Sequence, residues 1–555
     1  MISAMKLSAM KLPVAILLAA FAAHAAPAAA QDMVALLARP ISPASIALLA
    51  EHAGDPAVQK RLAEAVKHEN TAVRAVAARV AFVTMSKGLA APLISAVAKE
   101  EHAHTAAEQV RALMGLLGAP GDQIVIRAVK RIGGPAAVAM AESLARTRPA
   151  DIPELLPTLL PLAYPRELGA AVATACSQHP ASANQILQAI IELKAANLFA
   201  SVLSSLQEAA RPAPPEALMQ ALQSPHEAFR SAVVWHLFYA AAAGDAIPDD
   251  VAAAAASKPV AAGTAASDLT WDAYGRELLA RFRGARATEA DWAGLISMAE
   301  NRPKALGLPL EVYARMTDAE LKAMGAVRGD KAAGGLRRLG RDAKRSDQDV
   351  EARTQVMRTI PVFAQGLVAD MLAVNNCRPP SAEHFAAGNV TYRPDGRAER
   401  IGLIEATMPK ECQAFVRGMM RLTIASPDHP VIPEIADHVL LIFDRKFLAC
   451  ADDPFPPVRP NVTLLYEPAR DPQFPAPIWP EAARRVNTAG GVVRLRATMS
   501  HTGCVTGAET IRSVHPLFDL AAIQSVIQGR YNTPAKINGV PVDSFVQWSV
   551  PFWNY

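Results

Sequence analysis

The sequence is poor in aromatic residues, in charge of one sign and in long apolar runs. Aromatic residues make up 5% of the 555 positions, and 56 basic against 52 acidic residues leave a net charge of +4. So small a charge excess excludes nucleic acid as the main partner. A charged content of 19% excludes a coiled-coil rod, and a hydrophobic content of 51% excludes a largely disordered chain. Because 10 of the 30 aromatic residues lie in residues 459–555, we expect two differently built regions.

Motifs of common enzyme classes are also missing. The sequence contains no G-x-S-x-G nucleophile elbow, no H-E-x-x-H zinc motif, no phosphate-binding loop and no paired metal motif. We therefore expect a protein that is not an enzyme, with no catalytic residue, no cofactor and no metal site. Binding to other proteins is the class of function that these absences favour.

The single long apolar run lies at the N-terminus. Lys6 and Lys11 precede 19 uncharged residues at 12–30, which end in Ala28–Ala30. A basic start, a short apolar centre and an A-x-A ending predict a secretory signal peptide at residues 1–30. An uncleaved membrane anchor is the alternative, because the run is just long enough to span a bilayer. We expect an exported, periplasmic protein, anchored to the inner membrane only if the signal is not cleaved.

Residues 31–375 show helical periodicity, with apolar residues three and four positions apart. Residues 70–77 read Asn-Thr-Ala-Val-Arg-Ala-Val-Ala, and Val110 with Arg111 repeats the Val-Arg pair 37 residues later. Helix pairs repeated at this period indicate an α-solenoid. The motif resembles that of HEAT repeats, and this resemblance implies a surface that binds other proteins. An irregular helical domain is the alternative.

A polar cluster in this region consists of Glu100, Glu101, His102 and His104. Carboxylates and imidazoles are adequate metal ligands, but a run of this kind at the end of a helix is more often a solvated turn. We prefer the solvated turn.

Residues 376–458 predict a small α+β module. Two strand-like runs flank the turn at Asp395 and Gly396, and a helix at 412–422 and a third strand at 438–443 follow. The predicted order is therefore strand, strand, helix, strand.

Four of the five cysteines lie in the last 180 residues. Disulfides are plausible in an exported chain, although spacing does not determine the pairing. Cys377 with Cys412 is the preferred pair. Cys176 has no second pair of ligands beside it and is expected to be a buried free thiol.

Residues 459–555 repeat the same order with clearer signals. Strands are predicted at 491–499, 504–511 and 545–552, an amphipathic helix at 518–527, and a hairpin turn at Asn538-Gly539. The motifs in chain order are Pro477, Trp479, Pro480 and Ala483, then Gly491 and Gly503, then Phe518, Asp519, Ala521 and Ala522, then Arg530, Tyr531, Pro534 and Ala535, then Asn538, Gly539, Pro541 and Val542. In this order and spacing they resemble the TonB C-terminal domain of the energy transducer TonB family.

That resemblance implies a two-layer α+β domain whose sheet edge accepts a short extended segment of a partner. Main-chain hydrogen bonds supply affinity in this mode, and side-chain pockets supply selectivity. The edge is expected at the terminal strand. The candidate partner-binding residues are Arg530, Phe545, Val546, Gln547, Trp548 and Ser549. The implied partners are outer-membrane TonB-dependent receptors or other envelope proteins.

The sequence therefore predicts a multidomain chain. A HEAT-like all-α solenoid at 31–375 follows the signal peptide, and an α+β TonB C-terminal-like domain at 459–555 ends the chain. The module at 376–458 is interpreted as a degenerate copy of that domain, because its elements follow the same order. The function hypothesis is a periplasmic adaptor that binds partners by β-strand addition and by its helical-repeat surface, with its oligomeric state left open. The alternative is an inner-membrane-anchored energy transducer, although a helical array replaces the proline-rich spacer typical of that family.

Overall fold

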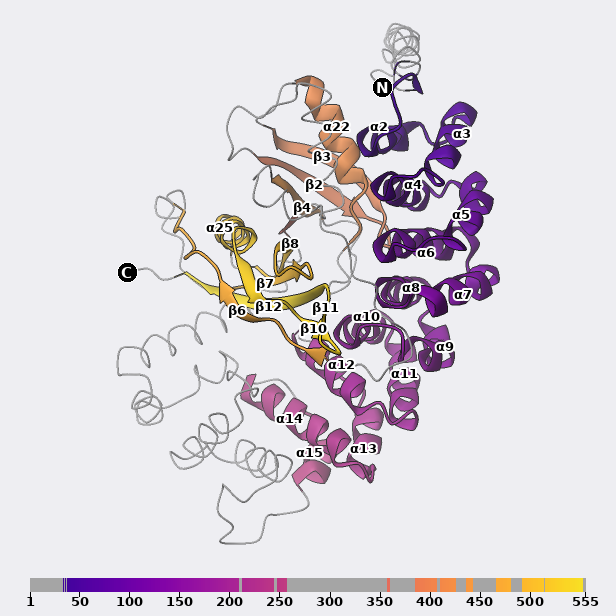
Figure 1. The fold of residues 1–555 in the computed structure, drawn as a ribbon. Helices are drawn as coiled ribbons and strands as arrows, with labels where there is room; N and C mark the ends of the chain where they lie inside the picture. Colours follow the sequence, from indigo (N-terminus) through magenta and orange to yellow (C-terminus); the bar gives the residue numbers. More distant parts are fainter. Residues whose placement is uncertain are drawn as a thin grey trace, which may run out of the picture.

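The structure, a computed structural model, describes residues 33, 35, 37–208, 212–243, 247–256, 357–359, 385–406, 410–425, 436–442, 466–480, 492–513 and 515–552. Its N-terminal part is an array of helices in two rows (Figure 1). The inner row, which faces the β-strands, comprises α2 (Pro43–Leu48), α4 (Thr71–Thr84), α6 (Ala103–Leu117), α8 (Gly134–Thr147), α10 (Pro165–Gln178), α12 (Ala196–Glu208) and α14 (Glu227–Ala243). The outer row comprises α3 (Pro56–Ala65), α5 (Ala90–Val97), α7 (Asp122–Ile132), α9 (Ile152–Leu159), α11 (Pro180–Glu192), α13 (Pro215–Gln223) and α15 (Asp249–Ala256). The predicted all-α character of the N-terminal region is confirmed for the described residues up to 256.

Helix caps and small residues explain the array locally. Asn70 caps α4, because its Oδ1 accepts hydrogen bonds from the N–H groups of Ala72 at 2.8 Å and Val73 at 3.2 Å. Gly169 of α10 lies so close to Ser201 of α12 that an added Cβ would come within 2.2 Å of the serine Oγ. Small residues therefore let neighbouring inner helices approach closely and still fill the space between them.

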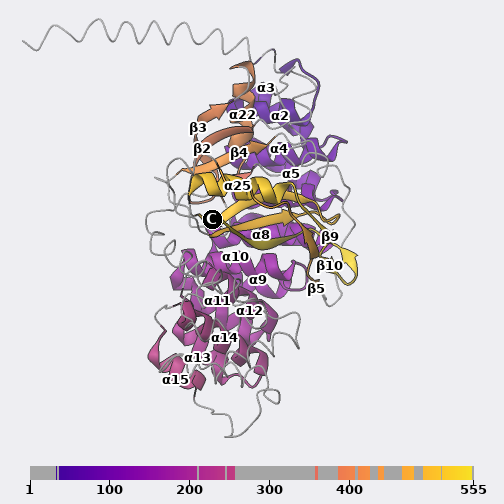
Figure 2. The ribbon, with the colours of Figure 1, turned by 90° about the vertical axis from the view of Figure 1, so that its left-hand side faces the viewer.

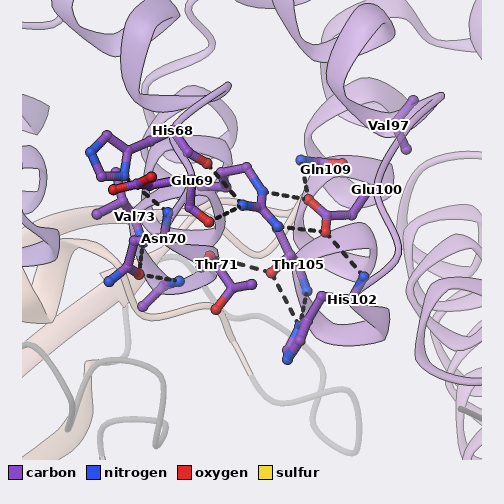
Figure 3. Close-up of polar contacts among 12 residues, drawn as sticks. His68, Glu69, Asn70, Thr71, Val73, Val97, Glu100, His102, Thr105 and Gln109 are labelled. Atoms are coloured by element: carbon purple, nitrogen blue, oxygen red, sulfur yellow. Dashed lines mark hydrogen bonds and ion pairs between the residues drawn. The ribbon is translucent and has the colours of Figure 1, made fainter. Parts of the chain in front are cut away.

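Within the polar cluster predicted as a solvated turn, Glu101 is exposed, but Glu100 is buried and connects two repeats through Arg74 (Figure 3). Glu100 is 4% exposed and accepts two hydrogen bonds from Arg74, at 2.7 and 2.8 Å. Burial would raise the pKa of Glu100, but hydrogen bonds from Arg74 and from the His102 N–H hold it below its ordinary value. The solvated-turn interpretation was wrong for Glu100 because it omitted Arg74, which lies 26 residues earlier and supplies the opposite charge.

The histidines of the cluster have separate roles. His102 caps α6, where its Nδ1 accepts a hydrogen bond from the Thr105 N–H at 3.4 Å. His104 points to the C-terminal domain, with its Nε2 3.4 Å from Asp543 Oδ2. In the described ranges, no three His, Cys, Asp or Glu residues are placed to hold a metal ion together.

A second set of ion pairs joins three inner helices. Glu108 of α6 accepts hydrogen bonds from Nε and Nη2 of Arg79 on α4, and from Arg111 Nη1 at 2.8 Å. Arg111 also donates to Glu142 of α8 at 2.9 Å. Burial would raise the pKa of Glu108, but the two guanidinium groups lower it to about 2. The arginines of the Val-Arg repeat, Arg74 and Arg111, thus each bind a carboxylate of the following repeat.

Seven of the described strands form one sheet with the order β12-β7-β8-β1-β4-β2-β3. Its strands are β1 (Met357–Thr359), β2 (Phe385–Tyr392), β3 (Ala398–Ala406), β4 (Asp437–Ile442), β7 (Val492–Met499), β8 (Val505–Arg512) and β12 (Ser544–Pro551). The helix α22 (Lys410–Arg421) packs on β2 and β3, and α25 (Pro516–Ile527) packs on β7 and β8. The predicted order of strand, strand, helix, strand is present in both C-terminal segments.

The remaining described strands are short. β5 (Tyr466–Glu467), β10 (Lys536–Ile537) and β11 (Val540–Pro541) form a three-stranded sheet, and β6 (Arg470–Gln473) pairs with β9 (Arg530–Thr533). Between β10 and β11, Asn538 and Gly539 have φ values of 52° and 78°. Two successive positive φ angles are typical of a type I′ hairpin turn, which agrees with the Asn-Gly prediction.

β1 departs from the predicted helical region. Residues 357–359 lie within 31–375, yet they form a strand between β4 and β8. Three residues are too few to show the period of a strand, so the surrounding helical pattern concealed this one. The predicted signal peptide at 1–30 and most of residues 257–384 lie outside the described residues. Among the described helices, none has the length and apolar character needed to cross a membrane.

The sheet packs against the inner row of the array (Figure 2). Figure 2 places the strands and α25 in front of α4, α8 and α10, with α13 and α15 beyond the end of the sheet. One apolar core is shared by the two parts. To the core of the array the C-terminal part contributes Val390, Tyr392, Ala398, Val416, Met419, Met420, Leu422, Ala425, Val439, Ala535, Ile537 and Val542. The array is therefore a support for the sheet and not a separate body.

Arginines of three inner helices also donate to main-chain carbonyls of the C-terminal part. These contacts are Arg79 to Leu422 at 3.1 Å, Arg146 to Ala425 at 2.8 Å and Arg166 to Phe545 at 3.2 Å. Each guanidinium satisfies a carbonyl that lies outside the strand ladders or at the sheet edge. From α4 to α10 the inner face is thus occupied by the protein's own chain.

Candidate partner-binding edge

The terminal strand β12 forms one end of the seven-stranded sheet. It pairs antiparallel with β7 along its whole length, from Ser544 opposite Met499 to Pro551 opposite Val492. On its other side, no strand of the described ranges is paired with it. A strand in this position presents a row of main-chain groups away from the sheet.

The direction of these groups follows from the contact with the array. The Phe545 carbonyl accepts a hydrogen bond from Arg166, which belongs to α10 and lies outside the sheet. Because both main-chain groups of alternate residues point to the same side in an antiparallel pair, Gln547, Ser549 and Pro551 share this outward direction. Pro551 has no N–H to lose there, which agrees with the tolerance of edge strands for outward-facing proline.

The side chains of one face of β12 belong to the core under α25. Val550 is buried, and Trp548 packs edge-on against Phe474 of the loop after β6, with ring centroids 4.9 Å apart. Trp479 packs in the same way on Phe518 of α25, at 4.9 Å. Phe552, directly after β12, stacks on Phe518 with ring centroids 4.8 Å apart and so ties the end of β12 to α25. These contacts explain why aromatic residues concentrate in this domain.

On the opposite face, Phe545 lies between two arginines. The guanidinium carbon of Arg496 is 4.0 Å from its ring centroid, and that of Arg166 is 5.0 Å away. Phe545 is buried by these contacts, whereas Ser549, on the same face further along, is exposed. The array therefore covers the start of β12 and leaves its second half open.

Two acidic groups lie where this domain meets the array. Asp543, just before β12, accepts a hydrogen bond from the His501 N–H at 2.8 Å and lies 3.4 Å from His104 of α6. Burial would raise the pKa of Asp543, but its contacts with His104 and His501 hold it below the ordinary value. Asp543 is thus an ionised anchor between the domain and the array.

Glu167 of α10 behaves in the opposite way. The residue is half-buried, but its Oε2 is buried, and no group of the described chain donates a hydrogen bond to that atom. Burial raises the pKa of Glu167 to about 7, although Arg496 and Arg166 act to lower it. A carboxyl that is neutral in weak acid and charged above neutrality makes this contact depend on pH.

We expect Glu167→Gln to stabilise the chain at pH 8 but hardly at pH 5. Below about pH 4.5 the Glu167 carboxyl is protonated in both the folded and the unfolded chain, so its burial costs no charge. As the pH rises through about 7 the buried carboxyl becomes charged, and this advantage of the folded state is lost. The amide removes that loss, so the free energy of unfolding should rise by about 1–3 kcal/mol at pH 8 and by under about 1 kcal/mol at pH 5. Thermal or urea unfolding at the two pH values measures this. Glu154→Gln, on the exposed side of α9, is the control, and an equal gain from Glu167→Gln at both pH values would contradict the assignment.

The structure brings together five of the six residues predicted for the site. Phe545, Val546, Gln547, Trp548 and Ser549 are consecutive in β12, although Phe545 is covered by the array. Arg530 is instead the first residue of β9, which pairs with β6 in a separate two-stranded sheet. Arg166, Glu167 and His104 were missed, because each belongs to the array and local sequence carries no signal of a contact with the domain.

Cys504, directly before β8, is disulfide-bonded, and Cys176 is a buried free thiol. By elimination the partner of Cys504 is Cys377, Cys412 or Cys450, whose side chains lie outside the described residues. All three precede residue 459, so the disulfide ties the C-terminal domain to the segment before it. The preferred pair of Cys377 with Cys412 stays a prediction.

The strand order favours Cys450 as the partner. β4 is parallel to β1 and β1 is antiparallel to β8, so β4 ends on the side of the sheet where Cys504 directly precedes β8. Two strand spacings, about 10 Å, separate β4 from β8, and the eight residues after Ile442 can span them. Non-reducing peptide mapping by mass spectrometry should find Cys504 linked to Cys450 and Cys176 alkylated without reduction. A link from Cys504 to Cys377 or Cys412 would contradict this assignment, and it would also exclude the pair of Cys377 with Cys412.

An antiparallel sheet with one helix on its face and an open terminal strand defines a small two-layer α+β domain. Its edge is suited to binding an extended peptide by strand addition. Residues 475–552 match the family described as Gram-negative bacterial TonB protein C-terminal, and this part of the chain is a TonB C-terminal domain. No curated protein and no solved structure matches the chain.

Proposed function

We propose that this chain is an exported envelope protein whose TonB C-terminal domain binds an extended segment of another protein along β12. The observation that carries the proposal is the exposure of Ser549 on β12. Within the described residues this strand is paired on one side only, with β7. The partner is an envelope protein, with outer-membrane TonB-dependent receptors as the class that the family suggests. The role that we propose is binding and not catalysis.

In this proposal the array presents the domain to its partners. Its inner face supports the sheet from α4 to α10 through the shared core and the three arginine contacts. A partner that also used the helical-repeat surface would have to bind faces that the sheet does not cover. Removal of residues 459–555 would expose the apolar inner face, so point variants are better tests than deletion.

The test is a photoreactive amino acid at position 549 of the full chain, activated in cells. An intermolecular adduct at this position, identified by mass spectrometry, supports the proposal. The same residue placed at Thr498, which is exposed on β7 away from the edge, is the matched control. Adducts of equal yield at both positions, or none at 549, would count against it.

The second candidate function is an inner-membrane-anchored energy transducer. The 19 uncharged residues at 12–30 are the observation that favours it. N-terminal sequencing of the exported protein separates the two functions. A start near Gln31 leaves only the adaptor, because a cleaved chain cannot transmit force from the inner membrane. A start at Met1 in a membrane fraction favours the transducer.

A further inference from the structure

The seven-stranded sheet contains the same arrangement of strands twice. In the C-terminal half the order is β12-β7-β8, and in the other half it is β4-β2-β3. In each half the chain forms a hairpin, then a helix over that hairpin, then a third strand antiparallel to the first strand of the hairpin. β4 therefore occupies in one half the position that β12 occupies in the other.

The two equivalent edges differ in what lies beside them. β12 has no neighbouring strand on its outward side in the described ranges, whereas β4 has β1. β1 runs parallel to β4, with Met357 opposite His438, Arg358 opposite Val439 and Thr359 opposite Leu440. On its other side β1 has one antiparallel pairing, Arg358 with Glu509 of β8.

We propose that the outward edge of β4 is a second strand-accepting site, which the chain fills with its own segment β1. The ligand class is an extended peptide that runs parallel to β4. The proposal rests on the proposed function of β12 and extends that function to the equivalent edge. It implies that the segment at 385–442 is a second copy of the TonB C-terminal arrangement. The recognition edge of this copy is covered by β1 of the same chain.

The pairing between β1 and β4 is short, which indicates that another extended segment could replace β1. It covers three of the six residues of β4, whereas β12 pairs with β7 over eight. A separate peptide could pair with the whole of β4, but it must compete with a tethered segment at an effective concentration on the order of millimolar. The closed edge therefore opens only when β1 is weakened or a partner segment pairs along more of β4.

The test uses the full chain with Met357, Arg358 and Thr359 all replaced by proline. Proline removes the N–H groups with which β1 pairs on both sides. Hydrogen–deuterium exchange in residues 437–442 should rise at least about ten-fold, because β4 loses one of its two neighbours. Arg358→Ala, which keeps its N–H, should leave this exchange unchanged. Unchanged exchange in the α4 to α8 helices verifies that the variant is folded.

A synthetic peptide with the sequence of residues 353–361 is then added to the triple-proline variant. Recovery of protection in 437–442, saturating with peptide concentration, supports a strand-accepting site. Unchanged exchange in the variant, or increased exchange that the peptide does not reverse, would overturn the proposal. The adduct at position 549 is read out in the same variant. The adduct is measured in the wild-type chain as well. Absence of an adduct at position 549 in the wild-type chain would count against the β12 function alone, so failures of the two proposals are distinguishable.

Discussion

Glu108→Ala is expected to lower the free energy of unfolding by about 3–5 kcal/mol, because it leaves Arg79 buried without its carboxylate. Arg79 is 5% exposed and binds Glu108 through two guanidinium nitrogens. Arg111 loses the same acceptor but keeps Glu142. Urea unfolding of the full chain measures the effect.

The matched control is Glu64→Ala. The Arg61–Glu64 pair is longer, at 3.7 Å, and the Glu64 side chain is 48% exposed, so its loss should cost under about 1 kcal/mol. Because Arg79 also donates to the Leu422 carbonyl, Glu108→Ala should increase amide exchange around α22 as well. A cost for Glu108→Ala as small as that of the control would show that the buried pair does not hold the repeats together.

Ser549→Pro is expected to weaken partner binding at least about ten-fold, equivalent to roughly 1.4 kcal/mol or more. The substitution removes an outward N–H of β12 and places a proline ring where the partner strand would lie. The bonds between β12 and β7 stay intact, because the N–H of Ser549 points away from β7. The melting temperature should therefore change little, since an edge strand tolerates proline at an outward position. The measurement is the affinity for the protein captured at position 549.

Ser549→Ala is the control for this variant. It keeps the main-chain N–H, and it should retain affinity within about three-fold if main-chain pairing carries the binding. Proline at Val546 is a poorer choice, because the alternation along β12 directs its N–H towards β7. Equal losses from alanine and proline at 549 would assign the binding to the hydroxyl and not to the strand edge.

The three long strands and the helix of the C-terminal domain could be predicted because their signals are local, whereas the short strands β5, β6, β9, β10 and β11 were not predicted. Alternating apolar residues at 491–499 and the Asn538-Gly539 turn depend only on neighbours in sequence, and both elements are where they were expected. The repeated Val-Arg motif likewise predicted the helical array, although not the carboxylates that its arginines bind. Those carboxylates lie 26 and 31 residues further on.

Contacts between the array and the sheet could not be predicted in this way. Arg166 and Phe545 are 379 residues apart, and nothing in either helix or strand periodicity marks them as partners. His104 was assigned to a solvated turn for the same reason, because Asp543 lies in another domain. β1 escaped detection because three residues carry no period. The candidate edge was therefore predictable from sequence, but its coverage by the array at Phe545 was not.

Hydrogen–deuterium exchange of the full chain, free and bound to the protein captured at position 549, tests the central claim most directly. If β12 is the recognition edge and the inner face of the array serves the chain's own sheet, binding should slow exchange in residues 544–551. Exchange in α4, α6 and α8 should stay the same. Slower exchange confined to those inner helices, with β12 unchanged, would contradict the account.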